Sequence, residues 1–571
     1  MENKEIIKRL GLIASLLELH GENPFKVRGY SSAVYHLDKA DVQVAGKSRE
    51  ELEKLEGVGK GIAATIAEMN ETGESATLDK LLAQTPEGLV SLLEINGFGP
   101  KKIRTLWQEL DITDGKTLYE ACKAGKIAAV KGFGAKLQEK LENALQFTFV
   151  SQGKFRYRQV EEVIGSLVEQ LKSNLPDSLV EAAGEFRRNM EVVNNACIVI
   201  GIDDPATAHK FLDNLPSITK NEQASGPFTW RGKFNDLGLT LEIHITDQKK
   251  FFNLLLKHTG SAKHLSIPLP ENGTLYQIIS EQTFGSEADA YSAAGLQFIE
   301  PEMREGSFEF QLAQEQKLPE LLKLEDLKGT IHNHSTYSDG KNSLREMAEY
   351  CKGMGYEYLG IADHSKTAIY ANGLDEDRIN QQHQEIDELN KELAPFKIFK
   401  GIESDILNEG DLDYDDDVLA SFDFIVASIH SQLSMDINKA TNRLLTAIAN
   451  PFTTMLGHPT GRLLLKREGY PINHKAVIDA CAENNVIIEI NAHPFRLDLD
   501  WRWVHYALEK GVMLSINPDA HSTAQYELMK YGVLVGRKGG LTKKETFNCL
   551  DCEAVDKYFR ERKEKVLSKA Q

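Results

Sequence analysis

The sequence predicts a multidomain α/β protein with a helical front, a mixed α/β middle and a rear array of alternating strands and helices. Its 571 residues are too many for one hydrophobic core, so several domains are expected. One short glycine motif recurs three times within residues 1–150. From about residue 329 onward, short apolar strands alternate with amphipathic helices, and six or seven such units fit a parallel βα barrel.

The front repeat has the form helix, Gly-x-Gly turn, helix. It occurs in residues 52–69, 92–110 and 128–145, and its glycines are Gly57, Gly59, Gly97, Gly99, Gly132 and Gly134. Glycine permits a tight turn and leaves the first N–H groups of the next helix open, where they and the helix dipole attract a phosphate. Lysines that add positive charge follow the turns at Lys60, Lys101, Lys102 and Lys136.

A simpler interpretation of one such turn is a plain connection between packed helices. Three copies, each followed closely by lysine, favour contact with a phosphate backbone. The repeats resemble helix-hairpin-helix motifs, which implies that the front binds DNA without reading its sequence. The net charge of −19 does not oppose this, because residues 1–150 hold 20 Lys and Arg against 22 Asp and Glu and most of the acidity lies elsewhere.

The middle of the chain, from residue 151 to about 315, alternates helix and strand, with strand-like runs at 194–202 and 237–246. The six cysteines are scattered, which fits a reducing cytosol better than a disulfide framework. Cys549 and Cys552 are interpreted as ordinary thiols, because no second pair completes a zinc site. No apolar run is long enough to span a bilayer, so we expect a cytoplasmic protein without a membrane partner.

In the rear array, a histidine or an acidic residue stands at the end of nearly every predicted strand. The candidates are His332, His334, Asp339, His364, Glu403, His430, His458, Asp519 and His521. Strand carboxyl ends of a parallel βα array converge on one face, where active sites are built. Any one of these residues alone is as well explained by a structural hydrogen bond. The complete set instead predicts two or three divalent ions, because mixed imidazole and carboxylate ligands suit zinc, manganese or iron.

The segments "HNHSTYSDG", "ADHS", "GIESDI", "SIHS", "GHPTGRLL", "EINAHPFRLD" and "PDAHS" resemble the PHP (polymerase and histidinol phosphatase) domain over about residues 329–571. The resemblance implies a distorted (β/α)7 barrel with manganese or zinc. It implies one ion on His332, His334, Glu403 and Asp519, the catalytic set; a second on Glu403, His430 and His458; and a third on Asp339, His364 and His521. Arg462 and Arg496 would then be phosphate clamps or, equally, surface salt bridges.

The order of the parts resembles the bacterial family X DNA polymerases over the whole chain. That resemblance divides the chain into a DNA-end-binding helical domain, 1–75; a fingers-like domain, 76–150; a nucleotidyltransferase palm, 151–254; a thumb, 255–316; a linker, 317–328; and the PHP domain, 329–571. "NPFKVRGYSSAVYHL" (23–37) looks like the start of the first, and Thr259-Gly260-Ser261 like the thumb junction.

The palm motifs depart from the family. Members usually present Gly-Ser-x-Arg-Arg and then Gly-Asp-x-Asp, whereas this chain has "GEFRRNMEVVNNACIVI". Arg187 and Arg188 remain, but Glu185 replaces the serine that cradles the triphosphate. The other departures are Asn195 and Cys197 in place of the two metal-binding aspartates, Glu242 at the third carboxylate position, and Lys257 and His258 in place of the aromatic pair.

Neither an amide nor a thiol suits magnesium, and Glu185 would repel a triphosphate. Asp203 and Asp204 would rescue the palm only if the strand register shifted. The palm motifs therefore predict a domain that keeps its fold and has lost nucleotidyl transfer.

The sequence as a whole predicts a metal-dependent DNA phosphoesterase that works in repair as a 3′→5′ exonuclease, with 3′-phosphatase and abasic-site incision as related activities. Its expected partner is gapped, nicked or 3′-ended DNA. Three alternatives stay open: an active gap-filling polymerase with PHP editing, a small-molecule phosphatase like histidinol phosphatase, and a non-catalytic repair scaffold. The sequence leaves open the oligomeric state and which ions are bound.

Overall fold

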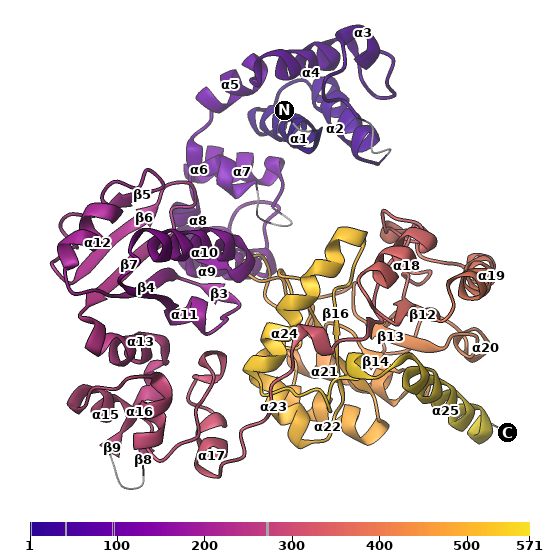
Figure 1. The fold of residues 1–571 in the computed structure, drawn as a ribbon. Helices are drawn as coiled ribbons and strands as arrows, with labels where there is room; N and C mark the ends of the chain where they lie inside the picture. The colour runs from indigo at the N-terminus through magenta and orange to yellow at the C-terminus, as the bar shows by residue number, and fades with distance from the viewer. Residues whose placement is uncertain (2, 40–42, 94, 96–97, 270–272, 571) are drawn as a thin grey trace. The chain divides into compact units, whose positions relative to one another are not determined.

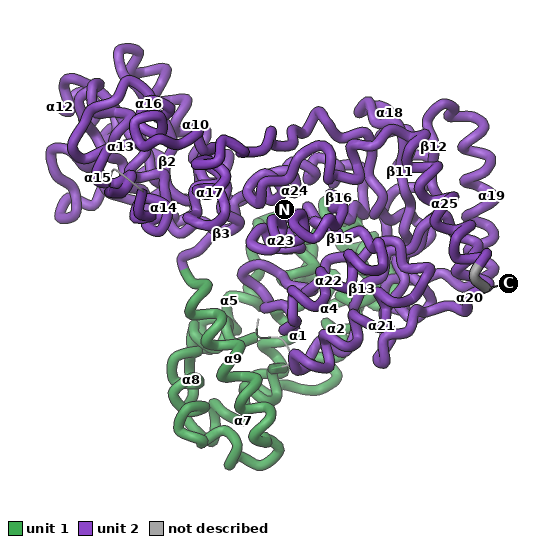
Figure 2. The backbone as a smooth tube through the Cα atoms, turned by 90° about the horizontal axis from the view of Figure 1, so that it is seen from below, with its two compact units in different colours: residues 1–152 green, residues 153–571 purple. Residues whose placement is uncertain are grey.

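The computed structural model describes residues 1, 3–39, 43–93, 95, 98–269 and 273–570. The chain forms two compact units, Met1–Gln152 and Gly153–Gln571, coloured separately in Figure 2. Among the described residues, no helix combines the length and the apolar composition that crossing a bilayer requires.

The first unit is built from helices. They are α1 (Asn3–His20), α2 (Pro24–Lys39), α3 (Arg49–Leu52), α4 (Lys60–Thr72), α5 (Ala76–Ala83), α6 (Glu87–Leu92), α7 (Pro100–Leu110), α8 (Gly115–Lys123) and α9 (Ala135–Ser151). One apolar core joins them and includes Leu10, Leu16, Ile66 and Leu106. The α1 helix is amphipathic, because its buried side chains, which include Ile6, Leu10, Ile13 and Leu17, recur at helical spacing.

The second unit begins with the predicted palm, a mixed sheet in the order β2-β4-β7-β6-β5. Figure 1 labels its strands β4, β5, β6 and β7. Its strands are β2 (Leu179–Ala183), β4 (Asn195–Gly201), β5 (Ile218–Lys220), β6 (Thr229–Phe234) and β7 (Thr240–Thr246). The two central strands, β4 and β7, run parallel, with Cys197 opposite Glu242 and Val199 opposite His244. Around them lie the short pair β1 (Phe155–Arg156) and β3 (Val192–Val193) and the helices α10 (Tyr157–Asn174), α11 (Gly184–Arg187) and α12 (Pro205–Leu212).

The two faces of this sheet have different partners. Ala196, Ile198, Leu241 and Ile243 point into the main palm core, whereas Cys197 joins a smaller cluster with residues of α13 (Phe251–Thr259). The period of two along each strand separates these sets. The α13 helix leads into the segment predicted as the thumb. Its elements are α14 (Ala262–Ser266), β8 (Pro268–Leu269), β9 (Gly273–Thr274), α15 (Leu275–Glu281), α16 (Glu287–Ala293) and α17 (Glu309–Gln314).

The rear array is a seven-stranded parallel sheet in sequential order, which confirms the predicted (β/α)7 fold. Its strands are β10 (Gly329–Thr330), β11 (Tyr358–Ile361), β12 (Lys397–Asp405), β13 (Phe424–Ser428), β14 (Met455–Leu456), β15 (Ile487–Asn491) and β16 (Leu514–Asn517). The first and last strands meet just beyond their ends, where Asn333 and Ala520 form an isolated parallel bridge and nearly close the barrel.

The barrel helices are α18 (Leu344–Gly353), α19 (Glu376–Leu393), α20 (Asp416–Leu419), α21 (Ile437–Ala449), α22 (His474–Asn484), α23 (Trp501–Glu509), α24 (Met529–Lys538) and α25 (Cys552–Ala570). Several begin at a side chain that accepts an N–H of the first turn: Ser343, Asp375, Asp436, Asn473 and Asp500. Such caps fix where each strand-to-helix loop ends and so place the residues that follow the strands.

Candidate metal centre and nucleic-acid interface

The structure brings all nine predicted ligands to the carboxyl end of the barrel. His332 and His334 follow β10, His364 follows β11, Glu403 lies within β12, and His430 follows β13. His458 follows β14, and Asp519 and His521 follow β16, while Asp339 lies in the loop after the first two histidines. Seven of the nine are buried or nearly so, with Asp339 and His521 at the more open side.

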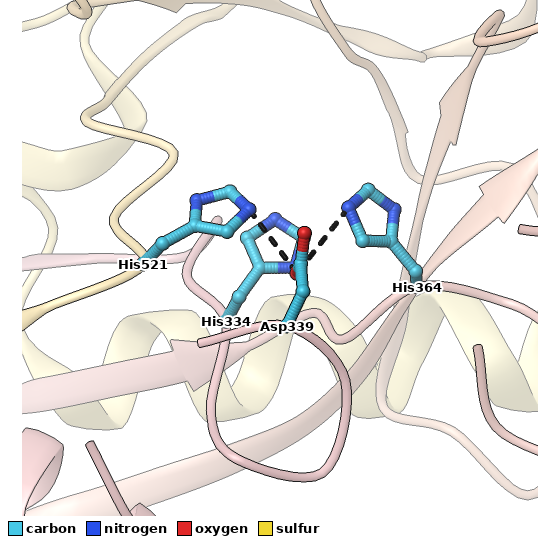
Figure 3. A group of neighbouring side chains, drawn as sticks. All are labelled: His334, Asp339, His364 and His521. Carbon is cyan, nitrogen blue, oxygen red and sulfur yellow. Dashed lines mark ion pairs between the residues drawn. The ribbon is translucent and has the colours of Figure 1, made fainter. Parts of the chain in front are cut away.

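One group of ligands consists of His334, Asp339, His364 and His521 (Figure 3). Asp339 Oδ1 lies 3.3 Å from His521 Nε2 and 3.7 Å from His364 Nε2. The His334 ring stacks on those of His364 and His521, with centroid distances of 4.4 and 4.2 Å. Three imidazoles therefore surround one carboxylate oxygen.

Glu403 is the centre of the remaining contacts. Its Oε1 lies 3.0 Å from His458 Nε2 and 3.2 Å from His430 Nε2, and its Oε2 lies 2.9 Å from His364 Nδ1. His332 and His334 also lie within 3.7 Å of this carboxylate. One acid contacting five imidazoles is suited to bridging ions.

The third group joins His332, His334 and Asp519, with His334 Nε2 3.0 Å from Asp519 Oδ1. Asp519 adopts the left-handed conformation, with φ of 52°, which is strained for a non-glycine residue. His334 belongs to two of these groups, and His364 also contacts Glu403.

Several polar atoms of this centre are buried without a hydrogen bond of acceptable geometry. They are His332 Nε2, His334 Nδ1 and Nε2, His364 Nδ1, His458 Nδ1 and Glu403 Oε2. Leaving buried nitrogen and oxygen atoms unsatisfied costs free energy, and native proteins rarely tolerate it. Nitrogen and oxygen donors converging in this way fit divalent cations.

Charge coupling inside the centre is strong. Burial alone would lower the pKa of His430, but Glu403 and Asp405 raise it to about 10. Burial likewise opposes protonation of His521, yet Asp339 and Asp519 raise its pKa to about 9. These imidazoles therefore pair as cations with the carboxylates when no metal is bound, and a bound metal has to displace their protons.

Two acidic residues that support the ligands were missed from the sequence. Glu489 Oε1 lies 2.7 Å from His332 Nδ1, and its Oε2 accepts the His458 backbone N–H at 2.8 Å. Asp405 Oδ1 lies 2.5 Å from His430 Nδ1. Such partners fix the tautomer and orientation of a metal-binding histidine. The available signal was an acid inside an otherwise apolar buried strand, in "VIIEIN" and "KGIESD".

The two candidate phosphate clamps lie in different surroundings. Arg462 donates to Asp500 and to the carbonyl oxygens of Arg496 and Leu497, so its fork is engaged within the protein. Arg496 Nε instead lies 3.6 Å from Asp519 Oδ2, beside the centre. Of the two arginines, Arg496 is therefore the one whose guanidinium group lies beside the candidate ligands.

In the first unit, the second glycine of each front repeat is the N-cap of the helix that follows: Gly59 for α4, Gly99 for α7 and Gly134 for α9. None of these three ends has a side-chain cap. The residues between the glycines, Val58, Phe98 and Phe133, are buried and anchor the turns. Gly57 and Gly132 have φ of 77° and 89°, which glycine alone adopts without strain.

The lysines predicted to accompany these turns, Lys60, Lys101, Lys102 and Lys136, are exposed. Gly97 lies outside the described residues. Open N–H groups at a helix start, beside an exposed ammonium group, form an anion-binding arrangement.

In the palm, Asn195, Cys197 and Glu242 lie on one face of β4 and β7, as the predicted alignment requires. Their partners differ from those of a metal site for magnesium. Arg231 donates to Glu242 Oε1 from Nε at 2.8 Å, and Glu185 accepts both the backbone and side-chain N–H groups of Asn194. Asp204 caps α12 through the N–H of Ala206, so it does not reach this face.

The palm arginines are also engaged. Arg187 donates to Thr259 Oγ1 and to both oxygens of the buried Glu287. Arg188 donates to Glu305 Oε1 at 2.9 Å and to the Thr259 carbonyl at 2.8 Å. Both guanidinium groups therefore connect the palm to the thumb region.

Comparison with known proteins follows this division of the chain. Residues 1–75 match the family model of a helix-hairpin-helix domain, and residues 330–493 match that of a PHP domain. The chain is 36% identical over 579 aligned residues to "DNA polymerase/3′-5′ exonuclease PolX" of Bacillus subtilis (strain 168), covering 98% of this chain and 100% of that protein.

Shorter matches cover less than half of this chain. A probable phosphatase of Thermoanaerobacter sp. (strain X514) is 28% identical over 31% of this chain and 74% of its own length. A probable phosphatase of Acetivibrio thermocellus is 25% identical over 42% of this chain and 97% of its own length.

Proposed function

The chain belongs to the bacterial family X DNA polymerases that carry a C-terminal PHP domain, and on that premise we propose that it is a metal-dependent 3′→5′ DNA exonuclease whose polymerase centre is inactive. The substrate is the 3′ end of gapped, nicked or single-stranded DNA in repair, in the cytoplasm. Removal of 3′-phosphates and incision at abasic sites use the same centre.

The observation that carries this proposal is the Glu403 carboxylate surrounded by five imidazoles at the carboxyl end of the barrel. The nine converging residues would hold two or three ions, for which manganese or zinc fits the imidazole and carboxylate donors. When bound, such ions polarise a phosphoryl oxygen and make water a nucleophile at neutral pH.

The chain's own residues position this chemistry. Glu489 and Asp405 fix the orientation of His332 and His430 through their Nδ1 atoms. Arg496 stands beside Asp519, where its guanidinium group meets the phosphate being cleaved. The Gly-x-Gly turns of the first unit hold the DNA backbone through open helix N–H groups and lysine, independently of sequence.

The palm lacks what nucleotidyl transfer needs. Two ions in a polymerase palm require carboxylates, and here an amide and a thiol occupy two of the three positions. The remaining acid, Glu242, is paired with Arg231. Arg187 and Arg188 are held by Glu287 and Glu305, which removes them from a triphosphate.

The test is digestion of 5′-labelled single-stranded and gapped DNA by the purified chain with manganese. We expect products shortened stepwise from the 3′ end, lost with a chelator and in His332→Ala. The matched control is His209→Ala, a partly exposed histidine of α12 outside the barrel, which keeps the activity. No digestion by the wild type would overturn the proposal.

Two further assays separate the alternatives. Templated primer extension with magnesium or manganese should be absent, and its presence would identify an active polymerase. Hydrolysis of histidinol phosphate faster than of DNA would instead identify a small-molecule phosphatase. The shorter relatives are named probable phosphatases.

A further inference from the structure

A second group of candidate metal ligands lies in the palm, outside the barrel. Cys197, His244 and His258 each offer a donor atom, and these atoms lie within 4.8 Å of one another. The three residues come from three elements: β4, β7 and α13. Nothing in the exonuclease centre uses them.

Strand register explains why they meet. Because Cys197 is opposite Glu242 and Val199 is opposite His244, Cys197 and His244 share one face of the parallel pair. The α13 helix covers that face through Phe251 and Leu255 and brings His258 onto it. The His244 and His258 rings stack with centroids 3.6 Å apart and planes at 23°.

The arrangement is unsatisfied as it stands. His244 Nε2 is buried and has no hydrogen-bond partner, and the nearest carboxylate oxygen, Glu242 Oε1, is 3.7 Å away. That oxygen already accepts from Arg231. Packing in the apolar cluster with Phe251 and Leu255 explains why the Cys197 thiol is buried. It does not provide a hydrogen-bond partner for His244 Nε2.

We propose that Cys197, His244 and His258 bind one zinc ion and that the ion fastens α13 to the palm sheet. One thiolate and two imidazoles match zinc and exclude magnesium, which prefers oxygen ligands. Loading draws the donors to separations of about 3.3–3.8 Å, as zinc–nitrogen and zinc–sulfur bonds of about 2.0–2.3 Å require. The stacked rings turn apart to reach them.

The proposal gives the palm substitutions a common meaning. Cys197 stands where the family places a metal-binding aspartate, and His258 where it places one of an aromatic pair. Together with His244 they convert an oxygen-ligand site for a catalytic ion into a nitrogen and sulfur site. The same face of β4 and β7 then stabilises the fold and no longer supports nucleotide addition.

The test is anaerobic titration of the full-length, reduced protein with cobalt(II), which replaces zinc and absorbs in the near ultraviolet when a thiolate binds it. No predicted barrel ligand is a cysteine, so this charge-transfer band reports only a thiolate site. We expect the intensity of the band to correspond to one thiolate-bound cobalt ion per chain. Added zinc should displace this ion and abolish the band. Cys197→Ser should remove the band, and His258→Ala should remove or strongly weaken it.

Two controls keep the result specific. Cys549→Ser, in the partly exposed CxxC, tests the other available thiols and should keep the band. Asp519→Ala, which disables the barrel centre, should keep it too. The circular-dichroism spectrum and the DNA digestion rate of Cys197→Ser establish that this variant is folded.

Absence of the band in the wild type at saturating cobalt would overturn the proposal. So would a band that survives in Cys197→Ser or disappears in Cys549→Ser. Because the band is independent of DNA digestion, its failure is distinguishable from failure of the exonuclease assignment.

Discussion

The barrel centre and the palm sheet each place a carboxylate on a parallel strand, but the two carboxylates have different side-chain partners. Both Glu403 and Glu242 lie on parallel strands beside histidine. Among the described residues, the ion pairs of Glu403 are with five imidazoles, a type of side chain that binds metal ions when neutral. Glu242 meets the guanidinium group of Arg231, which is permanently charged and satisfies the carboxylate without a metal. The partner, more than the acid itself, decides whether an ion is needed.

The same comparison extends to the arginines. Arg496 lies beside the barrel centre, and its Nε is 3.6 Å from Asp519 Oδ2. Arg187 in the palm makes a bidentate pair with the buried Glu287, which Arg304 also contacts. A buried and paired guanidinium group supports the fold, whereas one beside unsatisfied ligands is available to a substrate.

The largest expected difference in DNA digestion comes from removing one side chain in each region. In the barrel this side chain is a predicted metal ligand, and in the palm it stands where the family has a metal-binding aspartate. Asp519→Ala should reduce DNA digestion by more than about 100-fold, since changes to supporting residues alone cost about 10–100-fold. Asn195→Ala, at the corresponding palm position, should change digestion less than about twofold. Initial rates with manganese measure both. Equal losses in the two variants would show that the regions form one catalytic centre.

The second contrast concerns pH. In the metal-free protein, His430 and His521 have pKa values raised to about 10 and about 9. Burial lowers the pKa of His332, but Glu489, Glu403 and Asp519 raise it well above its ordinary value, so all three imidazoles are protonated near neutrality. A metal must displace these protons, so affinity falls by up to about 1000-fold for each pH unit below all three values. In the palm, burial, with His244, lowers the pKa of His258 to about 4, leaving mainly the Cys197 thiol, whose pKa burial raises to about 12, to lose a proton.

Manganese titrations of the barrel and cobalt titrations of the palm across this range measure the two slopes. We expect about three displaced protons in the barrel, from His332, His430 and His521, and about one in the palm. The barrel slope should flatten as the pH rises past about 9 and then about 10. A barrel affinity that does not change with pH would contradict the pairing of these imidazoles with carboxylates.

The third expected effect tests support behind the ligands. Glu489→Gln removes the negative charge that orients His332 and should lower metal affinity or digestion by about 10–100-fold. Glu509→Gln, at an exposed position of α23, is the matched control and should leave both unchanged. Dialysis with manganese and initial rates measure the two quantities. An undiminished Glu489→Gln enzyme would leave His332 oriented by its other contacts.

The sequence was most informative where one residue type recurs at a fixed place in repeated elements. The glycine turns before α4, α7 and α9 and the polar residues after the barrel strands are local patterns of this kind. The role of Glu489 was not predicted, because it depends on contact with His332, which lies 157 positions earlier in the sequence. The pairing of Arg187 with Glu287, and the meeting of Cys197 with His244, likewise depend on tertiary packing between distant segments.

The smallest expected effects are on DNA affinity, and they concern the Gly-x-Gly turns of the first unit. Lys60→Ala and Lys136→Ala each remove one exposed ammonium group beside an open helix start. If each contacts one phosphate, the slope of log affinity against log salt should fall by about 0.9 per substitution on double-stranded DNA, uniformly across sequences. Lys80→Ala, an exposed lysine of α5 away from any Gly-x-Gly turn, is the control. Since metal binding at either centre involves none of these lysines, digestion of saturating DNA should persist, and a variant that lost it would place the turns inside the catalytic site.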